Sequence, residues 1–317
     1  MHQYTVSDPS ALETSLLEFL AKSKTDLELE NINCIFNSFI PQLANHYKLF
    51  CQSERWNSFI NICNHSSLRK ILLEDPYTRR SVEKPRGYAG DACLIDFMYK
   101  LSAPNPSDTY FGRELFWHLM ESSACQSVRW RALHLAEKID EVHQSNQKRI
   151  NILSLASGHL RELHYVRDFD QKVERFYGID QDPRSNEEAR RSLPYLQLDI
   201  REESILNVIR EKYKPNRPLD FIYSAGLFDY LNDKVAQKLI TSSFRLLAPG
   251  GRILVANFAP DLVEQAYMEA FMDWYLIYRD ENQMEALAED LPISQVGEVK
   301  TYRDAMGNVV YLQIIKN

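Results

Sequence analysis

From about residue 149 onward, short apolar segments alternate with stretches in which apolar residues follow helical spacing. The segments predicted to be strands are Ile150–Leu155, Arg175–Ile179, Tyr195–Leu198, Phe221–Ser224 and Arg252–Phe258. A helix is expected between each pair of consecutive strands. This alternation predicts right-handed crossovers and a parallel sheet with both faces covered, which is an α/β fold.

The C-terminal residues follow a different pattern. Two further strand-like segments, Val296–Arg303 and Val309–Ile315, flank the turn-forming residues 304–308. Two strand segments joined by a short loop that contains glycine predict a β-hairpin. We therefore expect the sheet to end in an antiparallel element.

The first 146 residues are predicted to be mostly helical. Asp8 and Pro9 suit the cap and the first turn of a helix. Apolar residues at helical spacing are Leu12, Leu16, Phe19 and Leu20, then Ile35, Phe36, Phe39, Ile40 and Leu43 interrupted at Pro41, and later Val128, Ala132, Leu135, Ile139 and Val142. A polar run at 143–149 follows the last of these amphipathic stripes. We predict an N-terminal helical substrate or lid domain at 1–146 and a second domain at 147–317.

Composition excludes several classes of protein. The 317 residues carry a net charge of −7, which disfavours a nucleic-acid partner. No apolar run approaches the roughly 20 residues that span a bilayer, and residues 1–10 lack the basic and apolar regions of a signal peptide. These features predict a cytoplasmic protein without a membrane span. The five cysteines are predicted to be reduced thiols, and no Cys and His residues have zinc-ligand spacing, so no metal is expected.

Small and acidic residues follow the predicted strands. Ile150–Leu155 leads into Ala156-Ser157-Gly158-His159, where a ligand could approach backbone N–H groups at a helix start. Asp180 ends the second strand 22 residues after Gly158, a position that suits hydrogen bonds to ribose hydroxyls. Because ligands bind outside the carboxyl ends of strands in open α/β sheets, we expect a ligand site there.

The third and fourth strands end in the same way. The third strand is expected to end in Leu198-Asp199-Ile200, where a side chain could face a nucleobase edge, and the fourth leads into Ser224, Ala225 and Gly226. Four consecutive strands with small or acidic residues at this edge indicate a ligand site more strongly than any one of them.

With these strand ends, residues 149–317 resemble a class I S-adenosylmethionine-dependent methyltransferase. Leu247–Val255 is similar to the family's L-x-P-G-G-x-L-x-V step before strand five, and the terminal hairpin matches strands six and seven. The resemblance implies a Rossmann-like seven-stranded sheet of order 3-2-1-4-5-7-6 with an antiparallel last strand. It also implies S-adenosyl-L-methionine as the cofactor.

The resemblance further implies roles for individual residues. The cofactor's amino-acid moiety would lie against Ala156, Ser157, Gly158 and His159. The ribose would bind Asp180, with Gln181 beside it, and the adenine would bind Asp199 and Ile200. The floor near the sulfonium would be Ser224, Ala225 and Gly226.

The sequence departs from the family at the first motif, which is acidic-x-G-x-G-x-G. The matching positions hold Ser154, Ala156, Gly158 and Leu160, so only the middle glycine is kept and the acidic residue is absent. Two interpretations follow: a variant loop binds the cofactor, or cofactor affinity has decayed.

A second resemblance concerns the residues after about 68. Asp75–Arg80, Lys84–Ala92, Gly226–Leu231 and Trp274–Arg279 are similar to segments of bacterial proteins assigned to biosynthesis of 3-hydroxypalmitic acid methyl ester, an extracellular signal. This resemblance implies a small-molecule acceptor and favours carboxyl O-methylation of a hydroxy-fatty or related acid.

Substrate contacts are predicted from chemistry. Aromatic faces suit a sulfonium, and arginine forks suit a carboxylate. The predicted substrate-binding residues are Arg86, Tyr88, Tyr230, Trp274, Tyr278 and Arg279, with Arg79 and Arg80 as further anchors for an acidic group; ion pairs or core packing are the alternatives for these residues. A carboxylate acceptor is ionised at pH 7 and needs no base, whereas an amine would be helped by His159, Asp229 or Tyr230. No catalytic residue is assigned.

The leading prediction is therefore methyl transfer to a small molecule in secondary metabolism. An N-methyltransferase of a natural-product intermediate is the nearest alternative. A non-catalytic binding protein on the same scaffold is the second, and a nicotinamide-dependent oxidoreductase is the third, although G-x-G-x-x-G is absent.

Overall fold

The computed structural model describes residues 18–19, 21–23, 32–51 and 53–317. Its contacts divide the chain into two compact units. The helical unit contains the described residues up to Gln126 together with Val263–Tyr275, and the sheet unit contains Ser127–Leu262 and Leu276–Asn317. These bounds differ from the predicted division between residues 146 and 147.

The helical unit is built from helices of very different length. They are α2 (Ile32–Phe50), α3 (Glu54–His65), α4 (Ser67–Leu72), α5 (Pro76–Glu83), α6 (Ala92–Met98), α7 (Tyr110–Met120) and α13 (Gln265–Phe271). The predicted stripe on α2 is buried at Phe36, Phe39 and Leu43, and the helix continues through Pro41. Asp8, Pro9, Leu12, Leu16 and Leu20 of the predicted first helix lie outside the described residues.

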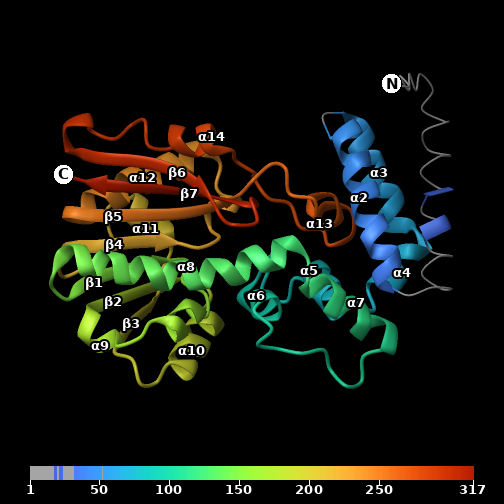
Figure 1. The fold of residues 1–317 in the computed structure, drawn as a ribbon, viewed down its shortest axis with the longest axis horizontal. Coiled ribbons are helices and arrows are strands. Elements are labelled where there is room, and N and C mark those ends of the chain that lie inside the picture. Colours follow the sequence, from blue (N-terminus) through green and yellow to red (C-terminus); the bar gives the residue numbers. More distant parts are fainter. Residues whose placement is uncertain (1–17, 20, 24–31, 52) are drawn as a thin grey trace. The chain divides into compact units, whose positions relative to one another are not determined.

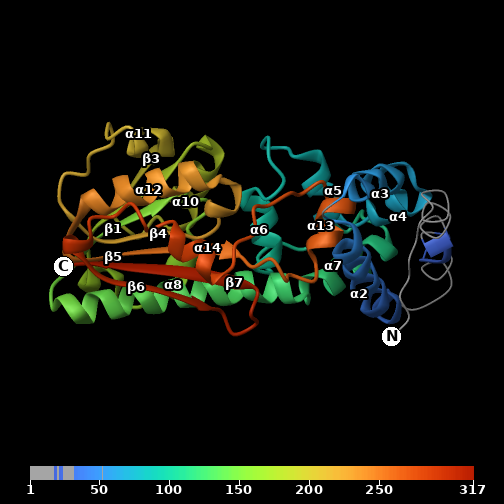
Figure 2. The same ribbon diagram turned by 90° about the horizontal axis from the view of Figure 1, so that it is seen from above.

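Helix α13 joins this unit although it follows the fifth strand in the sequence. It packs against α2 and α3, and both ribbon views show it beside them (Figures 1 and 2). Trp56 donates to Glu269 Oε2 at 2.7 Å, and the hydroxyls of Thr78 and Tyr267 lie 2.9 Å apart. The helical unit is therefore assembled from two separate segments of the chain, which the predicted N-terminal domain did not include.

The sheet unit contains seven strands in the order β3-β2-β1-β4-β5-β7-β6 (Figure 1). They are β1 (Ile150–Leu155), β2 (Val173–Asp180), β3 (Leu198–Glu202), β4 (Leu219–Ser224), β5 (Leu247–Phe258), β6 (Val296–Arg303) and β7 (Val309–Lys316). The first five strands are parallel, and β7 is antiparallel to both of its neighbours. The predicted Rossmann-like order, the terminal hairpin and the antiparallel last strand are confirmed.

Helices cover both faces of this sheet. They are α8 (Ser123–Asn146), α9 (Phe169–Lys172), α10 (Pro183–Ser192), α11 (Ile205–Ile209), α12 (Asp233–Leu246) and α14 (Glu281–Ala286), with short 3-10 turns at Arg161–Tyr165, Phe228–Tyr230 and Ile293–Gln295. Figure 2 shows α8 along one face and α11 and α12 on the other. The predicted stripe of α8 is buried at all five positions, Val128, Ala132, Leu135, Ile139 and Val142.

Strand β3 does not lie where the sequence predicted it. The prediction was Tyr195–Leu198, whereas the strand begins at Leu198 and ends at Glu202. After α10 the chain turns, with Leu196 N–H donating to Leu193 O and Leu198 N–H to Leu196 O, and Tyr195 is 63% exposed. The apolar residues that predict a strand here belong to this turn, and β3 ends four residues after the predicted end at Leu198.

Candidate functional site

The loop that leaves β1 has an unusual backbone. Ala156, Gly158 and Leu160 all have positive φ, at 52°, 56° and 53°. Left-handed backbone is unfavourable by roughly 1–2 kcal/mol for a residue with a side chain, because Cβ approaches the carbonyl oxygen. These are the three positions at which the resembled motif has glycine. The loop therefore adopts glycine-like conformations at all three, although only one glycine is present.

Neighbouring strands hold this loop in place. Ser157 N–H donates to Ile179 O at 3.0 Å, and Leu160 is 1% exposed. A Cβ placed on Gly178 would lie 3.3 Å from Ser157 Oγ and 3.5 Å from Leu160 Cδ1, so β2 leaves room for both side chains. Burial of the Leu160 side chain compensates for its strained backbone.

The strain at Ala156 predicts an unusual result for a glycine substitution. Replacing alanine by glycine inside a helix destabilises by about 1 kcal/mol. At Ala156 we expect Ala156→Gly to leave the free energy of unfolding unchanged within about 0.5 kcal/mol or to raise it, because the relieved strain offsets the added chain entropy. Urea denaturation measures this. Ala44→Gly, inside α2, is the control and should lose about 1 kcal/mol or more; equal losses in both variants would contradict strain at Ala156.

Asp180 ends β2 and faces this loop. Its side chain is 8% exposed; Oδ2 accepts from Gly158 N–H and Oδ1 from Asp182 N–H, both at 2.8 Å. Burial raises the pKa of Asp180 above its ordinary value, and the two backbone donors oppose that rise. A carboxylate has about four acceptor positions, so two remain for hydroxyl groups of a ligand.

The other residues predicted at this loop surround Asp180. Gln181 is exposed at the strand tip, and His159 is buried with Nδ1 lying 3.4 Å from Arg161 Nη2. Ser157 Oγ is buried and has no hydrogen-bond partner within the described part of the chain. An unpartnered buried hydroxyl is unfavourable, which makes it a candidate for contact with a ligand.

Asp199, which was predicted to bind the adenine, lies further from the carboxyl end of its strand than Asp180 does. Asp199 pairs with Tyr177 in the register of β2 and β3, whereas Asp180 is level with Glu202. Asp199 is half-buried and accepts from Arg201 at 2.8 and 2.5 Å. The expectation that β3 ends at Leu198-Asp199-Ile200 is therefore wrong, and Glu202 is the acidic residue beside the tip of β2.

The tip of β4 carries three of the residues predicted to line the cofactor site. Ser224 is buried and its Oγ donates to Leu155 O at 3.0 Å, which joins the ends of β4 and β1. Ala225 and Gly226 follow it, then a 3-10 turn containing Asp229. Asp229 is 3% exposed and its Oδ1 accepts from Phe258 N–H at 2.7 Å. Burial raises the pKa of Asp229 to about 7.

A buried charged cluster lies beside these strand tips and was not predicted. It consists of Arg131 of α8, Glu162 after the β1 loop, and Asp229, with exposures of 5%, 6% and 3%. Glu162 Oε1 accepts from Tyr223 Oη at 2.5 Å. Burial raises the pKa of Glu162, and the charge of Arg131 opposes the rise in both carboxyls. We call these three residues the arginine–carboxyl cluster.

A signal for this cluster was present in the sequence. Arg131 lies three residues after Val128 and four before Leu135, and therefore on the apolar face of α8. A cation on the buried face of an amphipathic helix needs a charged partner.

The structure contradicts a substrate role for Arg279. The side chain is 2% exposed. All five N–H donors of the guanidinium are used: Nε and Nη2 donate to Asp233 Oδ1, Nη1 donates to Phe228 O and Asn257 Oδ1, and Nη2 donates also to Leu231 O. No donor remains for a substrate carboxylate. Arg279 instead holds the loop after β4 against β5.

Two other predicted anchors are engaged within the helical unit. Arg79 pairs with Asp108 at 2.9 Å, and Arg80 makes two bonds to Asp91 at 2.9 and 2.8 Å. Asp91 also caps α6 by accepting from Leu94 N–H. The ion-pair interpretation is correct for both arginines.

The remaining substrate candidates belong to different units. Arg86 and Tyr88 are half-buried and Trp274 is buried in the helical unit, while Tyr230 is 41% exposed and Tyr278 half-buried in the sheet unit. Their role in binding a substrate stays a prediction.

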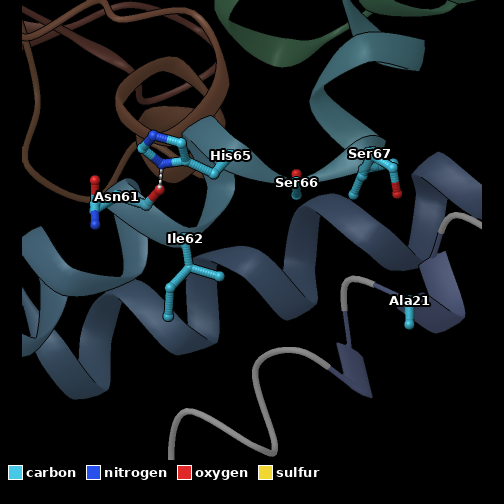
Figure 3. Close-up of a pocket in the computed structure, with 7 residues that line it drawn as sticks. Ala21, Asn61, Ile62, His65, Ser66 and Ser67 are labelled. Atoms are coloured by element: carbon cyan, nitrogen blue, oxygen red, sulfur yellow. Dashed lines mark hydrogen bonds between the residues drawn. The ribbon is translucent and has the colours of Figure 1, made fainter.

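An open hollow of roughly 430 Å³ lies in the helical unit (Figure 3). Its lining is Ala21, Asn61, Ile62, His65, Ser66, Ser67 and Leu68. His65 Nδ1 lies 2.8 Å from Asn61 O and is engaged within its own helix. The hollow contains none of the predicted site residues.

Within residues 18–19, 21–23, 32–51 and 53–317, no group of three or more His, Cys, Asp or Glu could hold a metal ion, and no helix has the length and apolarity that crossing a membrane requires.

Neither a family model nor a curated protein matches this sequence. Among solved structures, one described as a possible exported protein from Bordetella parapertussis is similar over 98% of this chain and 99% of its own, with 15% identity and a TM-score of 0.58. The S-adenosylmethionine-dependent methyltransferase SibL, in its apo form, is 16% identical over 76% of this chain and 69% of its own, with a TM-score of 0.49. The plantazolicin methyltransferase BamL, in complex with a triazolic analogue and S-adenosylhomocysteine, is 12% identical over 78% of this chain and 97% of its own, also at 0.49. The first likeness shows a shared fold across both units.

Proposed function

We propose that this protein is an S-adenosylmethionine-dependent methyltransferase acting on a small molecule. The observation that carries the proposal is the loop after β1, whose three left-handed residues present Gly158 N–H to Asp180. In open α/β sheets this edge binds nucleotides. A loop that keeps the left-handed backbone at all three positions with only one of the three glycines favours a variant cofactor loop over a decayed one.

The residues at the strand tips fit such a cofactor. Asp180 would accept from the ribose hydroxyls through its remaining lone pairs, and the unpartnered hydroxyl of Ser157 would bond the same ligand. Glu202 is level with Asp180 in the register of β2 and β3 and would contact the nucleoside in place of Asp199. When bound, the cofactor supplies the methyl group on a cationic sulfonium. The protein's tasks are to align the acceptor with that sulfonium and to exclude water.

For the acceptor, we propose a carboxylic acid of the hydroxy-fatty or related kind, giving a methyl ester. A carboxylate is ionised at neutral pH and needs no general base for methyl transfer. The segments similar to the 3-hydroxypalmitic acid methyl ester group support this class. The helical residues before 146 would contribute acceptor contacts, with Arg86 and Tyr88 as candidates, and we place the reaction in cytoplasmic secondary metabolism.

An amine acceptor is the second candidate, and Asp229 favours it. Burial raises the pKa of Asp229 to about 7, near the pH at which a general base works best, which suits a group that takes a proton from an ammonium. Asp229 also lies in the loop after β4, near the expected methyl group. N-methylation of a natural-product intermediate would use it in this role.

Turnover on matched panels of acids and amines tests these alternatives. Isotope-labelled S-adenosylmethionine should transfer its methyl group to acids, and esterase treatment should release it again. Amine-only transfer would end the ester proposal and support the N-methyltransferase. Binding of the nucleoside without transfer to any acceptor would indicate a non-catalytic binding protein. Tight NAD binding with no response to S-adenosylmethionine in calorimetry would contradict the methyltransferase proposal itself.

A further inference from the structure

Strand β6 is the last strand of the sheet, and one of its two edges is open. Within the described residues it pairs with β7 alone, and Figure 1 shows it at the end of the sheet. An edge strand presents backbone N–H and C=O groups that can pair with a further strand. Strand β6 has eight residues and no proline, and Glu298–Arg303 stays in regular register with β7. The open edge is therefore able to accept another strand.

The strand at the opposite edge of the sheet is protected. Strand β3 has five residues, and Arg190 donates to Ile200 O at 2.6 Å, which occupies a backbone carbonyl in the middle of the strand. The charges of β3 are also paired with each other, because Arg201 bonds Asp199. Short edge strands and engaged edge groups are devices that prevent pairing with another chain. This contrast marks β6 as the edge that is available.

The charges of β6 are arranged so that the strand complements a second copy of itself. Glu298 and Lys300 are both exposed, and because they are two residues apart they lie on the same face of the sheet. Two copies related by a two-fold axis make an isologous contact, in which the same strand pairs antiparallel with itself about one central residue. When that residue is Val299, Glu298 of each copy lies directly opposite Lys300 of the other.

Other registers of the two copies are less favourable. Centring the pair on Glu298 or on Lys300 places two like charges opposite each other, which destabilises a sheet. Centring it on Thr301 places Glu298 opposite Asp304 of the other copy. The register centred on Val299 gives two opposite-charge pairs on one face and a valine pair on the other, and both kinds of cross-strand pair are stabilising.

An exposed apolar residue beside β6 fits the same arrangement. Ile293 lies three residues before the strand and is 90% exposed. In the register centred on Val299, the residues that precede β6 in one copy come beside the turn that follows β6 in the other. That turn contains Ala305, which is exposed, and Met306, which is half-buried. The second copy therefore brings apolar side chains to the exposed Ile293.

We propose that the open edge of β6 binds β6 of a second copy of this chain, in antiparallel register centred on Val299. The two sheets then form one continuous sheet, and Glu298 and Lys300 make two reciprocal ion pairs across the axis. One strand pairing gives a small interface, so the dimer is weak and depends on concentration. This inference does not depend on the proposed function.

Sedimentation velocity of the full chain over a range of concentrations provides the test. The wild type should shift from the mass of one chain to that of two as the concentration rises. Glu298→Lys and Lys300→Glu should each weaken the dimer roughly 30-fold, because both pairs across the axis change from attractive to repulsive. Lys212→Glu changes an exposed lysine of the same unit outside β6, and it should dimerise like the wild type.

A mixture of the two charge variants separates this register from a loss of folding. In a one-to-one mixture, a strand with lysine at both positions meets a strand with glutamate at both, so dimers should return to wild-type strength. The double variant Glu298→Lys/Lys300→Glu exchanges the charges within each chain and should also dimerise. Thermal unfolding of each variant reports whether the sheet is intact.

Three results would overturn the proposal. A wild type that stays monomeric at every concentration would mean that the edge of β6 does not bind a second copy. A dimer that neither single variant weakens would be formed by another face of the molecule. Folded single variants that remain monomeric when mixed would exclude the register centred on Val299.

Discussion

Asp180→Asn should weaken binding of S-adenosylhomocysteine on the order of 100-fold, which corresponds to two charge-assisted hydrogen bonds. The substitution removes the negative charge that would bind the ribose hydroxyls. It also places an NH₂ group against one of the two backbone N–H donors, from Gly158 or Asp182, that now bond the carboxylate. Calorimetry on the purified chain measures the dissociation constant, and thermal unfolding reports whether the loop still folds.

Asp170→Asn is the matched control, because Asp170 is an exposed carboxylate of the same unit. Its affinity should equal that of the wild type. Asp180→Glu keeps the charge but displaces it by one methylene, and we expect an intermediate affinity. Wild-type affinity in a folded Asp180→Asn variant would mean that the nucleoside does not use this carboxylate, and the site proposed at the strand tips would be wrong.

Arg279→Met should lower the free energy of unfolding by about 3 kcal/mol or more, because buried carbonyl oxygens lose their donors. Phe228 O and Asn257 Oδ1 are both buried at their bonds to Arg279. The charge of Asp233 contributes less to this loss, since its side chain is 73% exposed. Guanidinium chloride denaturation followed by circular dichroism gives the value.

Arg217→Met provides the comparison, because Arg217 is exposed and its loss should change stability by less than about 0.5 kcal/mol. Arg279→Lys should lose nearly as much stability as Arg279→Met, since an ammonium has only three donors and none of the fork geometry. A stable Arg279→Met variant with a raised KM for acid acceptors would restore the substrate role that the buried contacts contradict.

Most of the sheet could be predicted because its strands are bounded by strong local signals. Ile150–Leu155 and Val296–Arg303 match the observed strands at both ends. Apolar runs between turn residues set such limits, and the glycine-containing loop at 304–308 closes the hairpin, where Gly307 adopts a φ of 79°. Strand β3 was predicted three to four residues too early, because the apolar residues of 195–198 lie in the turn that precedes it and the strand itself begins at Leu198.

The candidate site was harder to predict, since its chemistry depends on distant residues. Arg131 and Glu162 come from a helix and a loop that share no motif, and only the fold brings their charges together. Arg279 was expected to face a substrate because exposure cannot be read from one arginine in an aromatic segment. The left-handed backbone of Leu160 was likewise hidden, because leucine is rare in that conformation and a buried contact to β2 compensates for it.

The return of α13 to the helical unit has a consequence for synthesis of the chain on the ribosome. Helices α2 to α7 emerge first, but the segment that supplies Tyr267 and Glu269 to their core leaves the exit tunnel only after five strands have been made. Domains usually complete folding in order from the N-terminus. In this protein, helices α2 to α7 are translated early but keep apolar surface exposed until α13, a late segment, has been made and can pack against them.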